Sequence, residues 1–256
     1  MEIISNPVFY IKWIALWVAI LTVAILTIDK ERYKEHSKLV FMLFVIPVMA
    51  STLYLAGHTV YKNTISTTGG PIHWHADYQV WACGERLDLV DPIGMANKIG
   101  TPLFHEHNDD RIHVEGTVDD ISNVNLAAFF RTVGGKLTET QITYPTEGGE
   151  IVDLKTGDNC NGEPAELKVY VNGIKINNVD SYMYYAHSMV PPGDCVIIDF
   201  NNNLEDTTQR ICDFWAVEEW DYENFKDKRK LPNNEMVFKN ENYEYIDGLG
   251  LVEVNR

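Results

Sequence analysis

Two long apolar runs separate the beginning of the chain from the rest. Residues 8–28 are apolar apart from Lys12, and residues 39–60 are apolar apart from His58 near their end. Each run is about twenty residues long, which lets a helix cross a hydrocarbon core roughly 30 Å thick. The pattern therefore predicts a two-helix transmembrane hairpin over residues 1–62.

The segment between the two apolar runs predicts the orientation of this hairpin. Residues 29–38 contain four Lys or Arg residues, and the positive-inside rule places such a loop in the cytoplasm. We therefore expect a multi-pass protein of the cell membrane, held in lipid by two spans, with both termini and a large extracytoplasmic domain outside. A secretory signal peptide is the alternative for the first run. That run is too long, however, and no cluster of positive charge precedes it.

After the hairpin, the apolar residues change to the two-residue period of strands. A short polar linker over residues 63–71 leads into a domain over residues 72–203. Residues 204–256 are expected to form a short helix and then a charged, aromatic tail. The strongest hairpin signal is Asn172-Gly173, which follows the alternating apolar residues of 167–171.

One helix interrupts the predicted strands. Apolar side chains recur at helical spacing over residues 126–133, and Asp120 or Ser122 is suited to cap the helix. The order of elements predicts an α+β domain in which a mainly antiparallel sheet packs on one helix. A β-grasp-like arrangement of the sheet around that helix is the expected topology.

The formal charge divides unevenly between the two parts of the chain. The whole chain has a formal net charge of −16. Residues 1–62 carry a net charge of +2, so residues 63–256 carry −18. An acidic surface of this kind repels nucleic acid and anionic lipid headgroups and attracts cations. Nucleic acid is therefore not an expected partner, and no protein partner is indicated.

All four cysteines lie in the part of the chain that is predicted to be extracytoplasmic. An even number in an oxidising compartment favours two disulfide bonds, with three possible pairings. Free buried thiols that pack as small apolar side chains are the alternative. No Cys-x-x-Cys spacing occurs, which argues against a thiolate zinc site. The four residues are Cys83, Cys160, Cys195 and Cys212.

Five of the eight histidines fall between residues 73 and 113, where they form two His-x-His pairs and one His-x-Glu pair. Residues two apart in a strand project from the same face, about 7 Å apart at the Cα atoms. Several such pairs can therefore converge on one ion. Imidazole nitrogens suit zinc or copper, whereas magnesium and calcium require more oxygen ligands. The candidate metal ligands are His73, His75, His105, His107, His113 and Glu115.

Three carboxylates near these histidines have a second possible role. Glu115, Asp77 and Asp109 either bind the metal or accept the second ring N–H of a histidine and so fix its tautomer. His187 is expected to be a loop or core histidine, and closing the site from a distant hairpin is the alternative.

Four functions are consistent with this pattern. A Zn or Cu site for structure, capture or delivery is the leading hypothesis. A metal-dependent hydrolase of cell-envelope material requires three protein ligands and an open fourth position, so a closed set of four argues against it. The remaining alternatives are a metal-free interaction module and a small-molecule pocket. If no metal binds, the histidines are exposed or hydrogen-bonded to one another on an acidic sheet face.

Five further motifs occur within about residues 72–200: His105-Glu-His107-Asn-Asp, Ile112-His113-Val114-Glu115-Gly116, Leu126-Ala-Ala-Phe129, Val171-Asn172-Gly173 and Pro192-Gly193-Asp194. The chain resembles a family of uncharacterised, membrane-tethered or secreted archaeal and bacterial domains with His-x-His near the start and a later His-Val-Glu strand. The resemblance implies that the histidine cluster is a family feature, and it implies no particular activity.

Overall fold

A computed structural model describes most of the chain, which forms two compact units, Met1–Ile65 and Ser66–Arg256. The residues described are 7–95, 97–183, 193–202, 210–213, 243–246 and 250–253. Two predicted features, His187 and most of the helix and tail after residue 204, lie outside these residues. The two units are described separately below.

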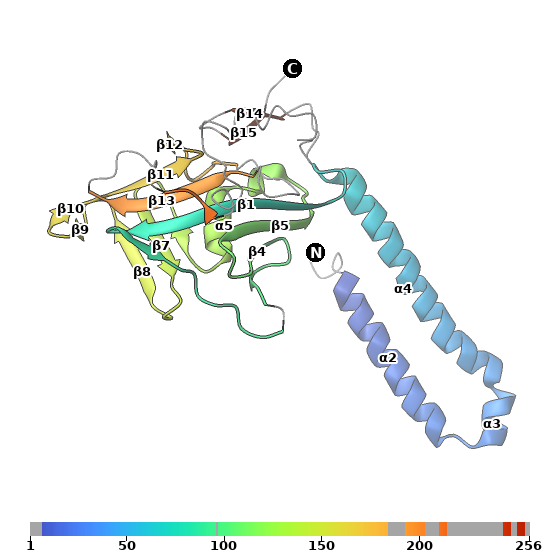
Figure 1. The fold of residues 1–256 in the computed structure, drawn as a ribbon. Helices are drawn as coiled ribbons and strands as arrows, with labels where there is room; N and C mark the ends of the chain where they lie inside the picture. The colour runs from blue at the N-terminus through green and yellow to red at the C-terminus, as the bar shows by residue number, and fades with distance from the viewer. Residues whose placement is uncertain are drawn as a thin grey trace. The chain divides into compact units, whose positions relative to one another are not determined.

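The first unit is a helical hairpin (Figure 1) of α2 (Pro7–Thr27), α3 (Lys30–Glu35) and α4 (Ser37–Ile65). Both α2 and α4 are long and apolar enough to cross a membrane. Large apolar side chains are exposed along both helices. The Trp17 indole N–H on α2 donates to the Leu43 carbonyl on α4 at 3.2 Å, which ties the helices together.

Helix α4 extends further than the sequence pattern suggested. It ends at Ile65, three residues into the segment that was expected to be a linker. Residues 63–65 contain no glycine or proline to stop the helix, and the Thr64 hydroxyl bonds the Val60 carbonyl within it. The segment between α4 and the first strand is therefore only residues 66–70.

The second unit is built on an eight-stranded sheet in the order β12-β11-β13-β1-β5-β4-β3, with β2 paired to β1. Strands β1 and β13 pair in parallel, and every other strand pair that the structure describes is antiparallel. The prediction of a mixed α+β fold with a mainly antiparallel sheet is confirmed. The strands of this sheet are β1 (Pro71–Ala82), β2 (Glu85–Leu87), β3 (Ile99–Gly100), β4 (Phe104–Glu106), β5 (Arg111–Thr117), β11 (Glu166–Val171), β12 (Ile174–Ile176) and β13 (Cys195–Asn201).

Three smaller sheets complete the described strands. The first is three-stranded, and the other two are two-stranded. Their strands are β6 (Lys136–Leu137), β7 (Gln141–Pro145) and β8 (Ile151–Lys155), then β9 (Asn159–Cys160) with β10 (Glu163–Pro164), and β14 (Tyr243–Ile246) with β15 (Gly250–Glu253).

The predicted hairpin at Asn172-Gly173 is confirmed. Both residues have positive φ, 50° and 79°, as a tight two-residue hairpin turn requires. This turn joins β11 to β12. A second turn of the same length, Cys83-Gly84, joins β1 to β2, also with both φ values positive.

One face of the large sheet forms the hydrophobic core. The even-numbered residues of β1 from Trp74 to Val80 are buried there, as are Ile112 and Val114 of β5. Helix α5 (Leu126–Thr132) packs on this face (Figure 1), where the Phe129 ring lies 5.2 Å from the ring of Tyr78. The alternation in the sequence therefore correctly assigned the two faces of β1 and β5.

The capping residue of α5 was predicted wrongly. Asp120 instead accepts the Ser122 N–H and begins the short 3₁₀ helix η1 (Ile121–Asn123). Asn125, five residues after Asp120, caps α5 by accepting the Ala128 N–H at 2.8 Å. Two helices begin close together here, η1 and then α5. Asp120 is the cap of η1, and Asn125 is the cap of α5.

Replacing Asn125 with alanine is expected to lower the free energy of unfolding by about 1 kcal/mol, because α5 loses its side-chain acceptor. The measurement is guanidinium unfolding of the full chain in detergent, followed by circular dichroism. Asn125→Ser is the control, since serine retains a capping oxygen. Equal losses in the two variants would contradict the capping role.

Candidate metal site

The candidate site lies on the face of the large sheet opposite the core. Strand register places His75 of β1 directly across from His113 of β5, and His113 directly across from His105 of β4. His73 lies across from Glu115 in the same way. Because residues two apart share a face, the three strands bring these side chains onto one patch.

The six predicted ligands come together in two groups that share one residue. In each group, one potential ligand atom per residue lies within 4.8 Å of the others. The β4 group consists of His105, His107, His113 and Glu115. The β1 group consists of His73, His75 and His113.

Two backbone carbonyls fix the rings of His105 and His107. The Nδ1 atom of His105 lies 3.2 Å from the Thr101 carbonyl, and the Nδ1 atom of His107 lies 2.5 Å from the Asn97 carbonyl. A carbonyl oxygen only accepts, so each Nδ1 carries a hydrogen, and Nε2 is the atom that holds the lone pair when such a ring binds a metal. Burial lowers the pKa of His105 to about 4 against the opposing effect of Glu115, so its ring is neutral near pH 7.

A carboxylate fixes the ring of His113. Its Nε2 atom lies 3.1 Å from a carboxylate oxygen of Asp109, which leaves the lone pair on Nδ1. Burial alone would raise the pKa of Asp109, but the hydrogen bond from His113 and the positive charge of Arg111 lower it below its ordinary value. The Nδ1 atom of His113 is buried, and no residue that the structure describes forms a hydrogen bond to it.

Glu115 connects the two groups through its two oxygens. Its Oε1 lies 2.9 Å from His73 Nε2, and its Oε2 lies 3.7 Å from His105 Nε2. Since His105 Nε2 carries a lone pair, it and Oε2 repel each other unless a cation or proton lies between them. His73 is 58% exposed and Glu115 is 38% exposed, so this end of the patch opens to the surface.

Glu106 is a residue of the site that the sequence did not single out. Its side chain is only 1% exposed, and it accepts the backbone N–H groups of Asn108, Asp109 and Asp110 at 2.6, 2.6 and 3.0 Å. Burial raises its pKa despite these three hydrogen bonds. Glu106 thus shapes the turn that positions Asp109 against His113. The turn-forming residues 108–110, which directly follow His107, were the sequence signal that could have indicated this role of Glu106.

Asp77 takes neither of the roles that were expected for it at the metal site. Its carboxylate lies 3.7 Å from Nε of Arg111, the residue opposite it on β5, and it belongs to neither group. Burial raises the pKa of Asp77 to about 8, against the opposing charge of Arg111. The Asp77–Arg111 pair instead separates the histidines from the next part of the same face.

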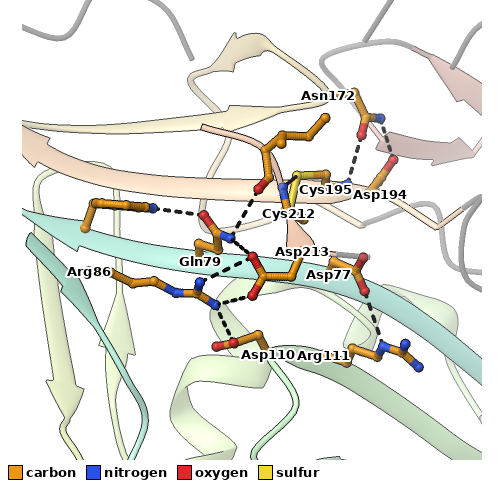
Figure 2. The surroundings of a disulfide bond; sticks show 12 residues. Asp77, Gln79, Arg86, Asp110, Arg111, Asn172, Asp194, Cys195, Cys212 and Asp213 are labelled. Carbon is orange, nitrogen blue, oxygen red and sulfur yellow. Dashed lines mark hydrogen bonds and ion pairs between the residues drawn. A yellow bond between two sulfur atoms is a disulfide. The ribbon is translucent and has the colours of Figure 1, made fainter. Parts of the chain in front are cut away.

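Residues 210–213, which we call the strap, cover that next part (Figure 2). The disulfide Cys195–Cys212 attaches the strap to β13, and Gln79 Nε2 donates to the Ile211 carbonyl at 3.2 Å. Arg86 then bonds Asp213 of the strap at 2.8 Å and also Asp110 of the turn before β5. This chain of contacts links the strap to the turn that positions Asp109.

The second disulfide, Cys83–Cys160, joins the β1–β2 turn to β9. The prediction of two disulfides is confirmed, and the structure selects one of the three pairings. Comparison with family models, curated proteins and solved structures found no match for this chain.

Proposed function

We propose that the protein is a membrane-anchored, extracytoplasmic metal-binding protein whose β4 group holds one Zn²⁺ or Cu²⁺ ion for capture or delivery. The observation that carries this proposal is the pattern of hydrogen bonds around the four residues of the β4 group. Each of them has a separate partner that holds one of its polar atoms. Each then has another atom available for an ion.

The partners match those that support metal ligands in proteins. Ligating histidines usually donate their second ring N–H to a carbonyl or a carboxylate, which fixes the tautomer and the ring orientation. Thr101, Asn97 and Asp109 serve His105, His107 and His113 in this way, and His73 serves Glu115. The Nδ1 atom of His113 is buried, has no hydrogen-bond partner among the described residues and holds a lone pair, so it is suited to bind an ion.

The donor set favours binding over hydrolysis. Three imidazoles and one carboxylate fill the four positions that zinc takes in a closed tetrahedral site. A hydrolytic zinc keeps one position open for water. Cu²⁺ accepts the same nitrogen and oxygen donors, so the two ions are the candidates that this chemistry supports.

The membrane anchor and the extracytoplasmic location are also proposals. Large apolar side chains are exposed along α2 and α4, which suits a lipid environment. The loop between them is rich in Lys and Arg, which favours a cytoplasmic loop. The two disulfides favour an oxidising compartment for the second unit.

We further propose that the sheet domain has a β-grasp-like topology. In support, the parallel pair β1 and β13 is central in the order β5-β1-β13-β11-β12, and α5 lies in the connection from β5 towards β11. The related suggestion, that residues 72–200 belong to the His-x-His and His-Val-Glu family, rests on the sequence motifs alone.

Metal analysis of the full chain, purified in detergent without a histidine tag, tests the proposed function. The expected result is one zinc or copper ion per chain after dialysis against the metal. Protein that folds normally but retains less than about a tenth of an equivalent would overturn the proposal.

Replacing Asp109 with asparagine is expected to weaken zinc affinity about 10–100-fold, because His113 loses the carboxylate that fixes its tautomer. The measurement is competition with a chromogenic zinc chelator. Asp153→Asn, on an exposed strand outside the site, is the matched control and should retain wild-type affinity. Unchanged affinity in Asp109→Asn would show that the carboxylate does not support a ligand.

A further inference from the structure

The β1 group forms a second constellation of nitrogen donors beside the β4 group. The His75 ring centroid lies 4.5 Å from that of His73 and 4.7 Å from that of His113. His73 is mostly exposed, whereas His75 and His113 are buried. Three imidazoles at these separations suit a transition-metal ion whose remaining position is filled by water.

The shared residue determines how the two groups are related. His113 holds Asp109 through Nε2, so only Nδ1 remains available for an ion. A histidine with one available nitrogen binds one ion at a time. The two groups are therefore alternative positions for a single ion, unless the hydrogen bond from His113 to Asp109 is given up.

We propose that His73 and His75, together with His113, form an outer position through which a Zn²⁺ or Cu²⁺ ion enters and leaves the β4 group. This inference rests on the proposed function of the β4 group. An ion that arrives from solvent meets the exposed His73 first and is then held by His75 and His113. The acidic charge of residues 63–256 would attract the cation to this surface.

Transfer inward is then an exchange of ligands around a fixed residue. His113 stays bound while His105, His107 and Glu115 replace His73 and His75. Glu115 is placed for this exchange, because one of its oxygens contacts His73 and the other faces His105. The ion remains coordinated throughout, so the outer histidines control the rate of exchange more than the affinity at equilibrium.

The test uses the full chain in detergent, with Zn²⁺ as the probe. Zinc loading from a chromogenic chelator and zinc loss to excess EDTA are followed by stopped-flow absorbance in the wild type, His75→Gln and His73→Gln. His36→Gln, between α3 and α4 and outside both groups, is the matched control. Circular dichroism with chelator present checks that each variant folds. The exposed His73→Gln variant keeps the test decisive if the buried His75→Gln variant does not fold.

Loading and loss that are both at least about tenfold slower in the variants, with one zinc still bound, would support the outer position. Glutamine at position 73 keeps an N–H group that can donate to Glu115, as His73 does. Exchange as fast as in the wild type would overturn it and leave the proposed function intact. Two zinc ions in the wild type and one in His75→Gln would also overturn it, because both groups would then be filled at once. A wild-type chain that binds no zinc would instead refute the proposed function itself.

Discussion

Replacing His113 with alanine is expected to abolish stoichiometric zinc or copper binding to the folded protein. His113 is the one residue that belongs to both the β4 group and the β1 group. Its loss leaves three residues in one group and two in the other, and it removes the partner that Asp109 holds. No complete four-ligand set then remains among the six predicted residues.

Metal content and thermodynamic linkage measure this effect independently. In the wild type, free zinc at about 100 times its dissociation constant should raise the free energy of unfolding by about 2.7 kcal/mol, because zinc binds the folded state. In His113→Ala, added zinc should leave that free energy unchanged. His58→Ala, on α4, should behave as the wild type. A full equivalent of metal in His113→Ala would contradict the assignment of His113 as the shared ligand.

The parts of the site that the sequence predicted are those that follow from local periodicity. The two-residue alternation in β1 and β5 assigned Trp74 and Val114 to the core, and His75 and His113 to the opposite face. The spacing of each pair is a property of an extended chain and needs no knowledge of the rest of the fold. The two apolar helices were predictable for the same reason, since length and composition determine them.

The parts that were missed depend on contacts between distant segments. The parallel pairing of β1 with β13 joins residues more than a hundred positions apart, and no local pattern specifies that register. Asp77 was expected near the metal, but the register places Arg111 opposite it. The contact of the strap with Gln79 joins two residues that are 132 positions apart in the sequence. These pairings come from tertiary packing, which local sequence patterns do not specify.

Glu106 was missed for a different reason. It stands between His105 and His107, and the His-x-His pattern predicts a role for the two imidazoles but none for the residue between them. Its carboxylate instead points to the turn, where three backbone N–H groups converge on it. Arg86 joins that turn to the strap, because it bonds both Asp110 and Asp213. Glu106 and Arg86 thus both hold the turn that positions Asp109 against His113.

Removing the two disulfides one at a time is expected to produce losses of stability that follow loop length. Cys83 and Cys160 are 77 residues apart, whereas Cys195 and Cys212 are 17 apart. The longer loop restricts the unfolded chain more, so Cys83→Ala/Cys160→Ala should lower the free energy of unfolding by about 4–5 kcal/mol. Cys195→Ala/Cys212→Ala should lower it by about 3 kcal/mol. Alanine avoids burying the hydroxyl group that serine would introduce.

Guanidinium unfolding of both double variants in detergent measures these two losses. The single-residue variant Asp213→Ala separates loop entropy from the contacts of the strap, because it breaks the contacts of Asp213 with Arg86 and Gln79 and leaves both disulfides intact. A small effect of Asp213→Ala, with the longer loop costing more, supports the entropic explanation. A larger loss in Cys195→Ala/Cys212→Ala than in Cys83→Ala/Cys160→Ala would contradict it. The strap would then stabilise the domain mainly through its contacts with Gln79 and Arg86.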